Sequence, residues 1–281
     1  MSGSDTRRPG GALRDVLLRA EVAAHPYPLL FATVSGAHLY GFASPDSDVD
    51  LRGAHVVPTV FFAGLDRVHE TVKSEHVRDG VEIDLVTHEV RKFCRLLLRN
   101  NGYVLEQLYS PLVVHTTPEH QELMRIARGC ITRSCVRHYL GFAANQWLLF
   151  EKGTPRRVKP LLYVFRVLLS GVHMMRTGQV NASLPECNAA LDAERLAWID
   201  ELIEVKTTGA ERGTIGGERL EFYEQEYQRW RERLSDEAAR STLPEEPTAE
   251  PEMRDFLWRI RAGRFSGQAE NTPAGTTEPR R

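Results

Sequence analysis

Two aspartates separated by one residue open a predicted strand, and a glycine turn lies shortly before them. Asp48 and Asp50 stand at the start of the predicted strand 49–57. The turn at Gly36 directly follows the apolar run 29–34, which is typical of a buried strand. Side chains alternate between the two faces of a strand, so the two aspartates are expected to point the same way. This arrangement favours a fold that mixes strands with helices.

The paired acids predict a metal site. Two like charges side by side repel, and they are expected where a hard cation binds, because Mg²⁺ uses one or two carboxylates together with phosphate oxygens. A third carboxylate would complete a two-metal site, and Asp84 in the predicted strand 81–86 is the candidate; Glu82, on the same face, is the alternative. A calcium loop is excluded, because Leu51 and Val57 stand where such a loop needs glycine and glutamate.

The hydrophobic pattern changes from mixed to helical near residue 115. Before this point, helices are predicted at 13–24 and 88–99, and the segment 68–77 is predicted to pair with the strand 81–86 as a hairpin. After it, helices are predicted at 118–129, 132–151, 158–177, 189–206, 217–235 and 253–262. We therefore predict an α+β fold. Its parts are a disordered leader (1–11), a catalytic core (12–115), an α-helical domain (116–235), and a linker, short helix and disordered tail (236–281).

Composition limits the partners of the chain. The formal net charge is −2, so any contact with nucleic acid must come from a local basic patch. We expect no membrane span, because no apolar run approaches about 18 residues, and we expect no secretory signal. The four cysteines lack the spacing of a zinc site and are expected to be reduced thiols in a cytoplasmic protein: Cys94, Cys130, Cys135 and Cys187.

The segment around the acids resembles the DNA polymerase β superfamily, which has a Gly-Ser turn, a spacer and then Asp-x-Asp on a strand. More narrowly, it resembles the RlaP (RNA repair) family of predicted nucleotidyltransferases. The matching positions are Gly36, Tyr40, Gly41, Ser47, Asp48, Asp50, Arg52 and Gly53. The resemblance continues through 90–97, 100–106 and 159–166. It implies a polymerase β-type core, a small mixed sheet with helices, followed by an α-helical domain.

The resemblance also implies a reaction. A nucleoside monophosphate would pass from an NTP such as ATP to an acceptor hydroxyl, with release of pyrophosphate and with Mg²⁺ or Mn²⁺ as cofactor. The expected catalytic and metal-binding residues are Asp48, Asp50 and Asp84. The residues expected to contact the nucleotide are Gly36 and Ala37 in the turn, and Lys159 and Arg166 on one face of a predicted helix.

Ala37 departs from the family pattern, which has serine at this position. Because this hydroxyl is missing, an alternative stays open, in which the protein retains the fold and binds nucleotides but is not catalytic. The acceptor also stays open. The family association suggests an RNA end, and the alternative is nucleotidylation of a protein or a small molecule.

Overall fold

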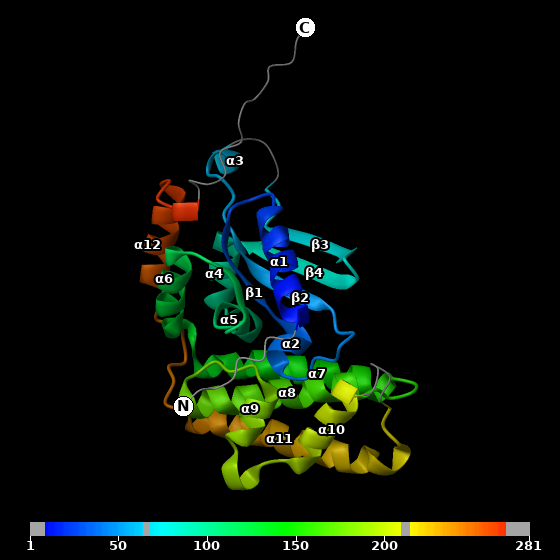
Figure 1. Cartoon of the computed structure of the whole chain (residues 1–281). Helices are drawn as coiled ribbons and strands as arrows, with labels where there is room; N and C mark the ends of the chain where they lie inside the picture. The colour runs from blue at the N-terminus through cyan, green and yellow to red at the C-terminus, as the bar shows by residue number, and fades with distance from the viewer. Residues whose placement is uncertain (1–8, 64–67, 209–213, 268–281) are drawn as a thin grey trace, which may run out of the picture.

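A mixed five-stranded sheet forms the first part of the chain (Figure 1). The computed structural model describes residues 9–63, 68–208 and 214–267. The strands are β1 (Leu29–Val34), β2 (Val49–His55), β3 (Thr71–Arg78), β4 (Val81–Glu89) and β5 (Val113–Thr116), in the order β3-β4-β2-β1-β5. β2 and β4 pair in parallel, and the other pairs are antiparallel. The predicted α+β class is confirmed.

Helices cover both faces of this sheet. They are α1 (Pro9–Ala23), α2 (Gly36–Tyr40), α4 (Val90–Leu97), α5 (Gly102–Leu108) and α6 (Pro118–Ala127), while α3 (Val60–Ala63) lies beyond the end of the sheet (Figure 1). Local sequence explains where two of them begin. The Asn101 side chain accepts hydrogen bonds from the first backbone N–H groups of α5, and Thr117 does the same for α6, in which Pro118 opens the helix.

The second part is built around one long helix. Its helices are α7 (Val136–Lys152), α8 (Val158–Thr177), α9 (Leu184–Ala189), α10 (Ala197–Thr208), α11 (Leu220–Arg240) and α12 (Glu250–Arg261). α8 packs against α7, α9, α10 and α11, and it ends at Gly178, which has a φ of 68°. Contrary to the expectation from the sequence, α8 is long and apolar enough to cross a membrane, but 78% of its apolar window is buried inside the protein. It serves here as the central core helix.

Several predicted boundaries are wrong. α1 begins at Pro9, inside the predicted leader, while residues 1–8 and 268–281 lie outside the described residues. α11 continues to Arg240, five residues into the predicted linker. The predicted helix 189–206 is instead the two helices α9 and α10. β5 was not predicted at all.

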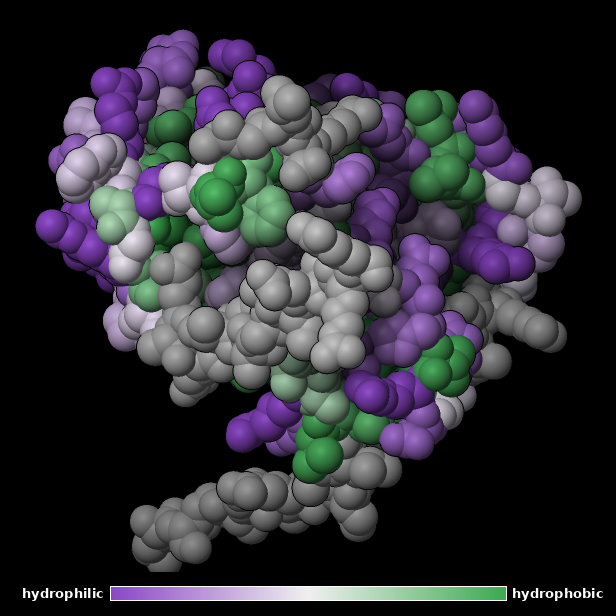
Figure 2. All heavy atoms as spheres, turned by 90° about the horizontal axis from the view of Figure 1, so that it is seen from above, coloured by the Kyte–Doolittle hydropathy of each residue, from purple (hydrophilic) through white to green (hydrophobic). Residues whose placement is uncertain are grey.

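The last helix returns to the first part of the chain. α12 packs against α4 and α6 (Figure 1), and Arg261 forms an ion pair with the buried carboxylate of Glu89. One hydrophobic cluster includes residues on both sides of the predicted boundary, such as Phe31 and Leu234. The division near residue 115 stays a prediction. On the face seen in Figure 2, hydrophilic areas surround smaller, separate hydrophobic ones.

The four cysteines are free and buried, as the sequence predicts.

Candidate active site

The parallel pairing of β2 with β4 brings two of the predicted acids together. Asp50 and Asp84 lie directly opposite each other in this pairing, so their side chains share one face of the sheet. Asp48 precedes the first residue of β2 and follows the loop from α2. The prediction that a third acid would come from a neighbouring strand therefore agrees with the register.

Arg52, which belongs to β2 like Asp50, lies between Asp50 and Asp84. The Nη2 atom of Arg52 donates hydrogen bonds to Asp50 Oδ1 and Asp84 Oδ2, both at 2.6 Å, and its Nε donates to Tyr103 Oη at 3.0 Å. The described residues contain no group of three or more His, Cys, Asp or Glu placed to hold a metal ion. The three carboxylates thus do not form a metal cluster here, because Asp50 and Asp84 share Arg52 instead.

The electrostatics of the site still favour a cation. Burial raises the pKa of Asp50 to about 6. Arg52 and Lys159 oppose this rise, and repulsion from Asp48 and Asp84 adds to it. Asp84 Oδ1 is buried and has no hydrogen-bond partner. Carboxylate oxygens are the donors that Mg²⁺ prefers, so these residues fit the predicted metal by donor type, although Arg52 occupies two of them in this structure.

The glycine of the predicted turn lies against Asp50. Gly36 has a φ of +61°, and a Cβ atom added to it would lie 1.7 Å from Asp50 Oδ2. Only glycine fits this backbone conformation and this close approach. Its neighbour Ala37 is 4% exposed and packs into the hydrophobic core. Its methyl group serves packing, so the part of Ala37 that a phosphate would meet is the backbone N–H.

The two basic residues predicted to contact the nucleotide have different environments. Lys159 is half-buried in the first turn of α8, and its charge acts on Asp50. Arg166, two turns later, is 1% exposed and donates a hydrogen bond from Nη1 to Glu106 Oε1 at 2.6 Å. Its Cζ atom lies 4.0 Å from the centre of the Tyr40 ring. In this structure Arg166 is thus buried between Glu106 and Tyr40, and its role as a nucleotide contact stays a prediction.

An acidic pocket opens along β3 and β4 and is lined by Asp48 and Asp84, though not by Asp50. It has a volume of about 380 Å³. Its lining residues are Asp48, Glu75, His76, Val77, Glu82, Ile83 and Asp84. Glu82, the alternative to Asp84, thus lies in the same pocket. Glu75 was missed from the sequence; it lies opposite Asp84 in the pairing of β3 with β4, and nothing in its local sequence indicates this.

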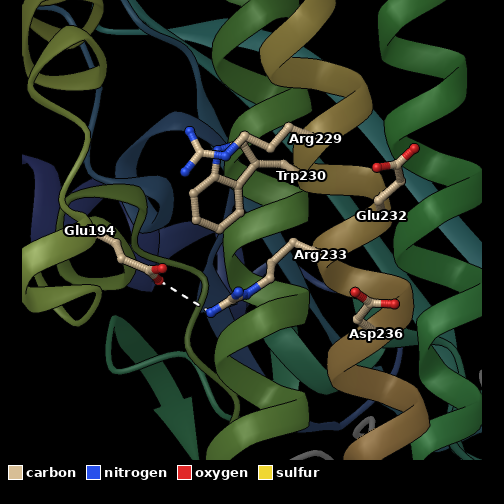
Figure 3. Close-up of a pocket in the computed structure, with 6 residues that line it drawn as sticks. All are labelled: Glu194, Arg229, Trp230, Glu232, Arg233 and Asp236. Carbon is tan, nitrogen blue, oxygen red and sulfur yellow. Dashed lines mark hydrogen bonds and ion pairs between the residues drawn. The ribbon is translucent and has the colours of Figure 1, made fainter.

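A second pocket lies among charged side chains on α11, and Figure 3 shows how its residues lie. It has a volume of about 160 Å³. Arg233 Nη2 forms an ion pair with Glu194 at 3.3 Å across it, and Arg233 Nε pairs with Glu237 at 3.0 Å. The first contact joins α11 to the turn before α10, and the second lies within α11. Arg233 is thus held by carboxylates of the chain itself.

Comparisons with known proteins agree with the resemblance seen in the sequence. The sequence profile of the RlaP family, described as the RNA repair pathway DNA polymerase beta family, matches residues 14–259. The chain belongs to this family. It therefore has the polymerase β-type core that the sequence predicts, and it is a nucleotidyltransferase-like protein.

Two curated relatives and one solved structure were also found. The chain is 30% identical to the uncharacterized protein MJ0002 of Methanocaldococcus jannaschii over 176 residues, which are 61% of this chain and 71% of that protein. It is 26% identical to the uncharacterized protein YcgL of Bacillus subtilis over 203 residues, which are 70% of this chain and 76% of that protein. A nucleotidyltransferase-like protein from Exiguobacterium sibiricum matches with a TM-score of 0.31 and 13% identity, covering 88% of this chain and 78% of that one.

Proposed function

We propose that this protein transfers a nucleoside monophosphate from an NTP to an acceptor hydroxyl and releases pyrophosphate. The observation that supports this most is the position of Asp50 directly opposite Asp84, with Asp48 two residues before Asp50. The acceptor oxygen would form a bond to the α-phosphorus, and the bond from that phosphorus to the pyrophosphate oxygen would break. Asp84 would draw the proton from the acceptor hydroxyl.

The acids would hold Mg²⁺ or Mn²⁺, and the bound cations would supply positive charge to the phosphates. The metal-binding residues in this proposal are Asp48, Asp50 and Asp84, and Lys159 would add a positive charge toward the triphosphate. The Gly36 turn would let backbone N–H groups approach the phosphates, because glycine leaves space there. In this proposal Arg166 supports the site only through the packing of α8.

The charge of the acidic pocket bears on which kind of acceptor the protein uses. The family description points to RNA, but the pocket beside the catalytic acids is lined by four carboxylates and one histidine. Phosphate groups of an RNA strand would be repelled by carboxylates that no metal neutralises, such as Glu75 and Glu82. This observation favours the second candidate, a neutral or cationic acceptor on a protein or a small molecule.

The test is label transfer from each α-labelled NTP with Mg²⁺ or Mn²⁺. The acceptors would be RNA ends, proteins with hydroxyl side chains and cationic small molecules. Asp50→Asn should lower the rate more than a hundredfold. Asp255→Asn, the same change at an exposed position of α12, should leave the rate unaltered. Thermal melting of Asp50→Asn should show a folded protein, because the substitution removes repulsion from Asp48 and Asp84.

Two outcomes would contradict the proposal. An active Asp50→Asn variant would remove this site from the reaction. NTP binding by the wild type without transfer to any acceptor would instead support the non-catalytic alternative. Transfer to RNA alone would contradict the argument from the acidic pocket.

A further inference from the structure

A buried lysine from the helical part of the chain reaches the loop that carries Asp48. Lys206 lies in the last turn of α10 and is 1% exposed. Its Nζ atom donates a hydrogen bond to Ser44 Oγ at 2.6 Å. An ammonium group is rarely buried in this way unless its interactions offset the loss of hydration. The contact joins two segments that are 162 residues apart in the sequence.

The loop that Lys206 contacts is a tight turn that ends at Asp48. The backbone N–H of Ser47 donates to the carbonyl of Ser44 at 3.0 Å, and the backbone N–H of Ser44 donates to Ser47 Oγ at 3.0 Å. The two hydroxyl oxygens are also 3.0 Å apart. Both serines are buried. Lys206 thus binds Ser44 Oγ, which contacts Ser47 Oγ, and Ser47 immediately precedes Asp48.

The position of Asp48 needs such support. Its carboxylate has the same charge as Asp50 and Asp84, so repulsion favours conformations in which the loop moves away from the strand. Arg52 neutralises Asp50 and Asp84 directly. We propose that Lys206 is a positioning residue, which holds the 44–47 turn so that Asp48 stays beside Asp50 for cation binding. This inference rests on the proposed function, because that function gives Asp48 its role.

The test compares Lys206→Met with Lys92→Met. Lys92 is a matched control, because its Nζ also donates to a hydroxyl at 2.6 Å, that of Thr71. The measurements are Mn²⁺ binding by electron paramagnetic resonance, backbone hydrogen exchange over residues 42–49, and label transfer. For Lys206→Met we expect Mn²⁺ affinity to fall about tenfold or more, since the lost hydrogen bond involves a charged group. Exchange in the loop should be faster. Lys92→Met should change neither quantity.

A merely structural role would give another result. If Lys206→Met melts at a lower temperature but keeps wild-type Mn²⁺ affinity and loop exchange, the inference is overturned. If that variant does not fold, Ser44→Ala removes the same hydrogen bond with a smaller change, and its Mn²⁺ affinity and loop exchange decide. A wild type that binds Mn²⁺ but transfers no label would refute the proposed function alone. The inference would then stand if the loop and Mn²⁺ affinity still respond to Lys206→Met.

Discussion

Substitution of Gly36 by alanine tests whether Asp50 occupies its working position in this structure. The added Cβ would lie 1.7 Å from Asp50 Oδ2 and 2.7 Å from its Cγ. Real Cβ atoms essentially never approach another heavy atom within 3.0 Å, so the carboxylate must move by more than about 1 Å. A displacement of about 1 Å at a reacting centre can lower a rate about a hundredfold.

Gly80 provides the control for backbone strain. It has a φ of +78°, close to the +61° of Gly36, but a Cβ added there meets nothing within 4 Å. A residue other than glycine in this left-handed region costs about 1–2 kcal/mol, so Gly80→Ala should lower the free energy of unfolding by that amount. Gly36→Ala should cost more, about 3–5 kcal/mol. Moving Asp50 also weakens its 2.6 Å hydrogen bond to Arg52, and hydrogen bonds to charged groups contribute about 1.5–3 kcal/mol.

Urea denaturation would give both unfolding free energies, and label transfer would give both rates. Gly80→Ala should keep the wild-type rate, whereas Gly36→Ala should lose about two orders of magnitude. Equal unfolding free energies and equal rates for the two variants would refute this reasoning. Such a result would mean that Asp50 can move away from residue 36 without lowering the free energy of unfolding or the rate of transfer.

Two further predictions concern buried ionisable groups outside the acidic pocket. Arg166→Met leaves Glu106 buried and without its ion pair, so calorimetry should show a loss of about 3–5 kcal/mol in unfolding free energy. The NTP affinity of this variant should be unchanged. A tenfold loss of NTP affinity at full stability would instead support the nucleotide contact predicted from the sequence. Burial lowers the pKa of His55 to about 3, so only the unfolded state takes up its proton as pH falls below about 6.5. His55 alone should therefore lower the free energy of unfolding by about 2 kcal/mol between pH 7.5 and 5. In urea denaturation this decrease should be about 2 kcal/mol smaller in His55→Gln than in the wild type, and an equal decrease in both would contradict the assignment.

Local sequence was sufficient to predict the elements whose ends are marked by proline or glycine. β1 has the predicted bounds Leu29–Val34, because a mostly apolar run lies between prolines and a glycine turn. α8 has the predicted bounds Val158–Thr177, because its apolar pattern ends at Gly178. β5 has four residues, and its side chains are exposed or half-buried. It lacks an apolar run, and its pairing with β1 is a long-range contact that local sequence does not encode.

The site was predicted where it depends on strand periodicity. Alternation along β4 placed Asp84 and Glu82 on one face, and both line the acidic pocket. The contacts of charged residues were not predicted where the partner is distant in sequence. Lys159 and Arg166 share a helix face, yet Arg166 is buried because Glu106, 60 residues earlier, meets it. No local pattern indicates such a partner.

The residues that match the family therefore have two physical roles. Tyr40 and Arg166 lie in contact with each other, and Arg166 pairs with Glu106, so these matched positions join α2 and α5 to α8. Asp50 and Arg52 form the other group, in which a permanent guanidinium charge holds two carboxylates together. An arginine in that place lets the opposed acids stay close without a bound cation, since it offsets their repulsion. A cation that binds there must compete with Arg52, so we expect nucleotide phosphates to strengthen metal binding. Both groups match the family pattern, but only the second is expected to affect the reaction directly.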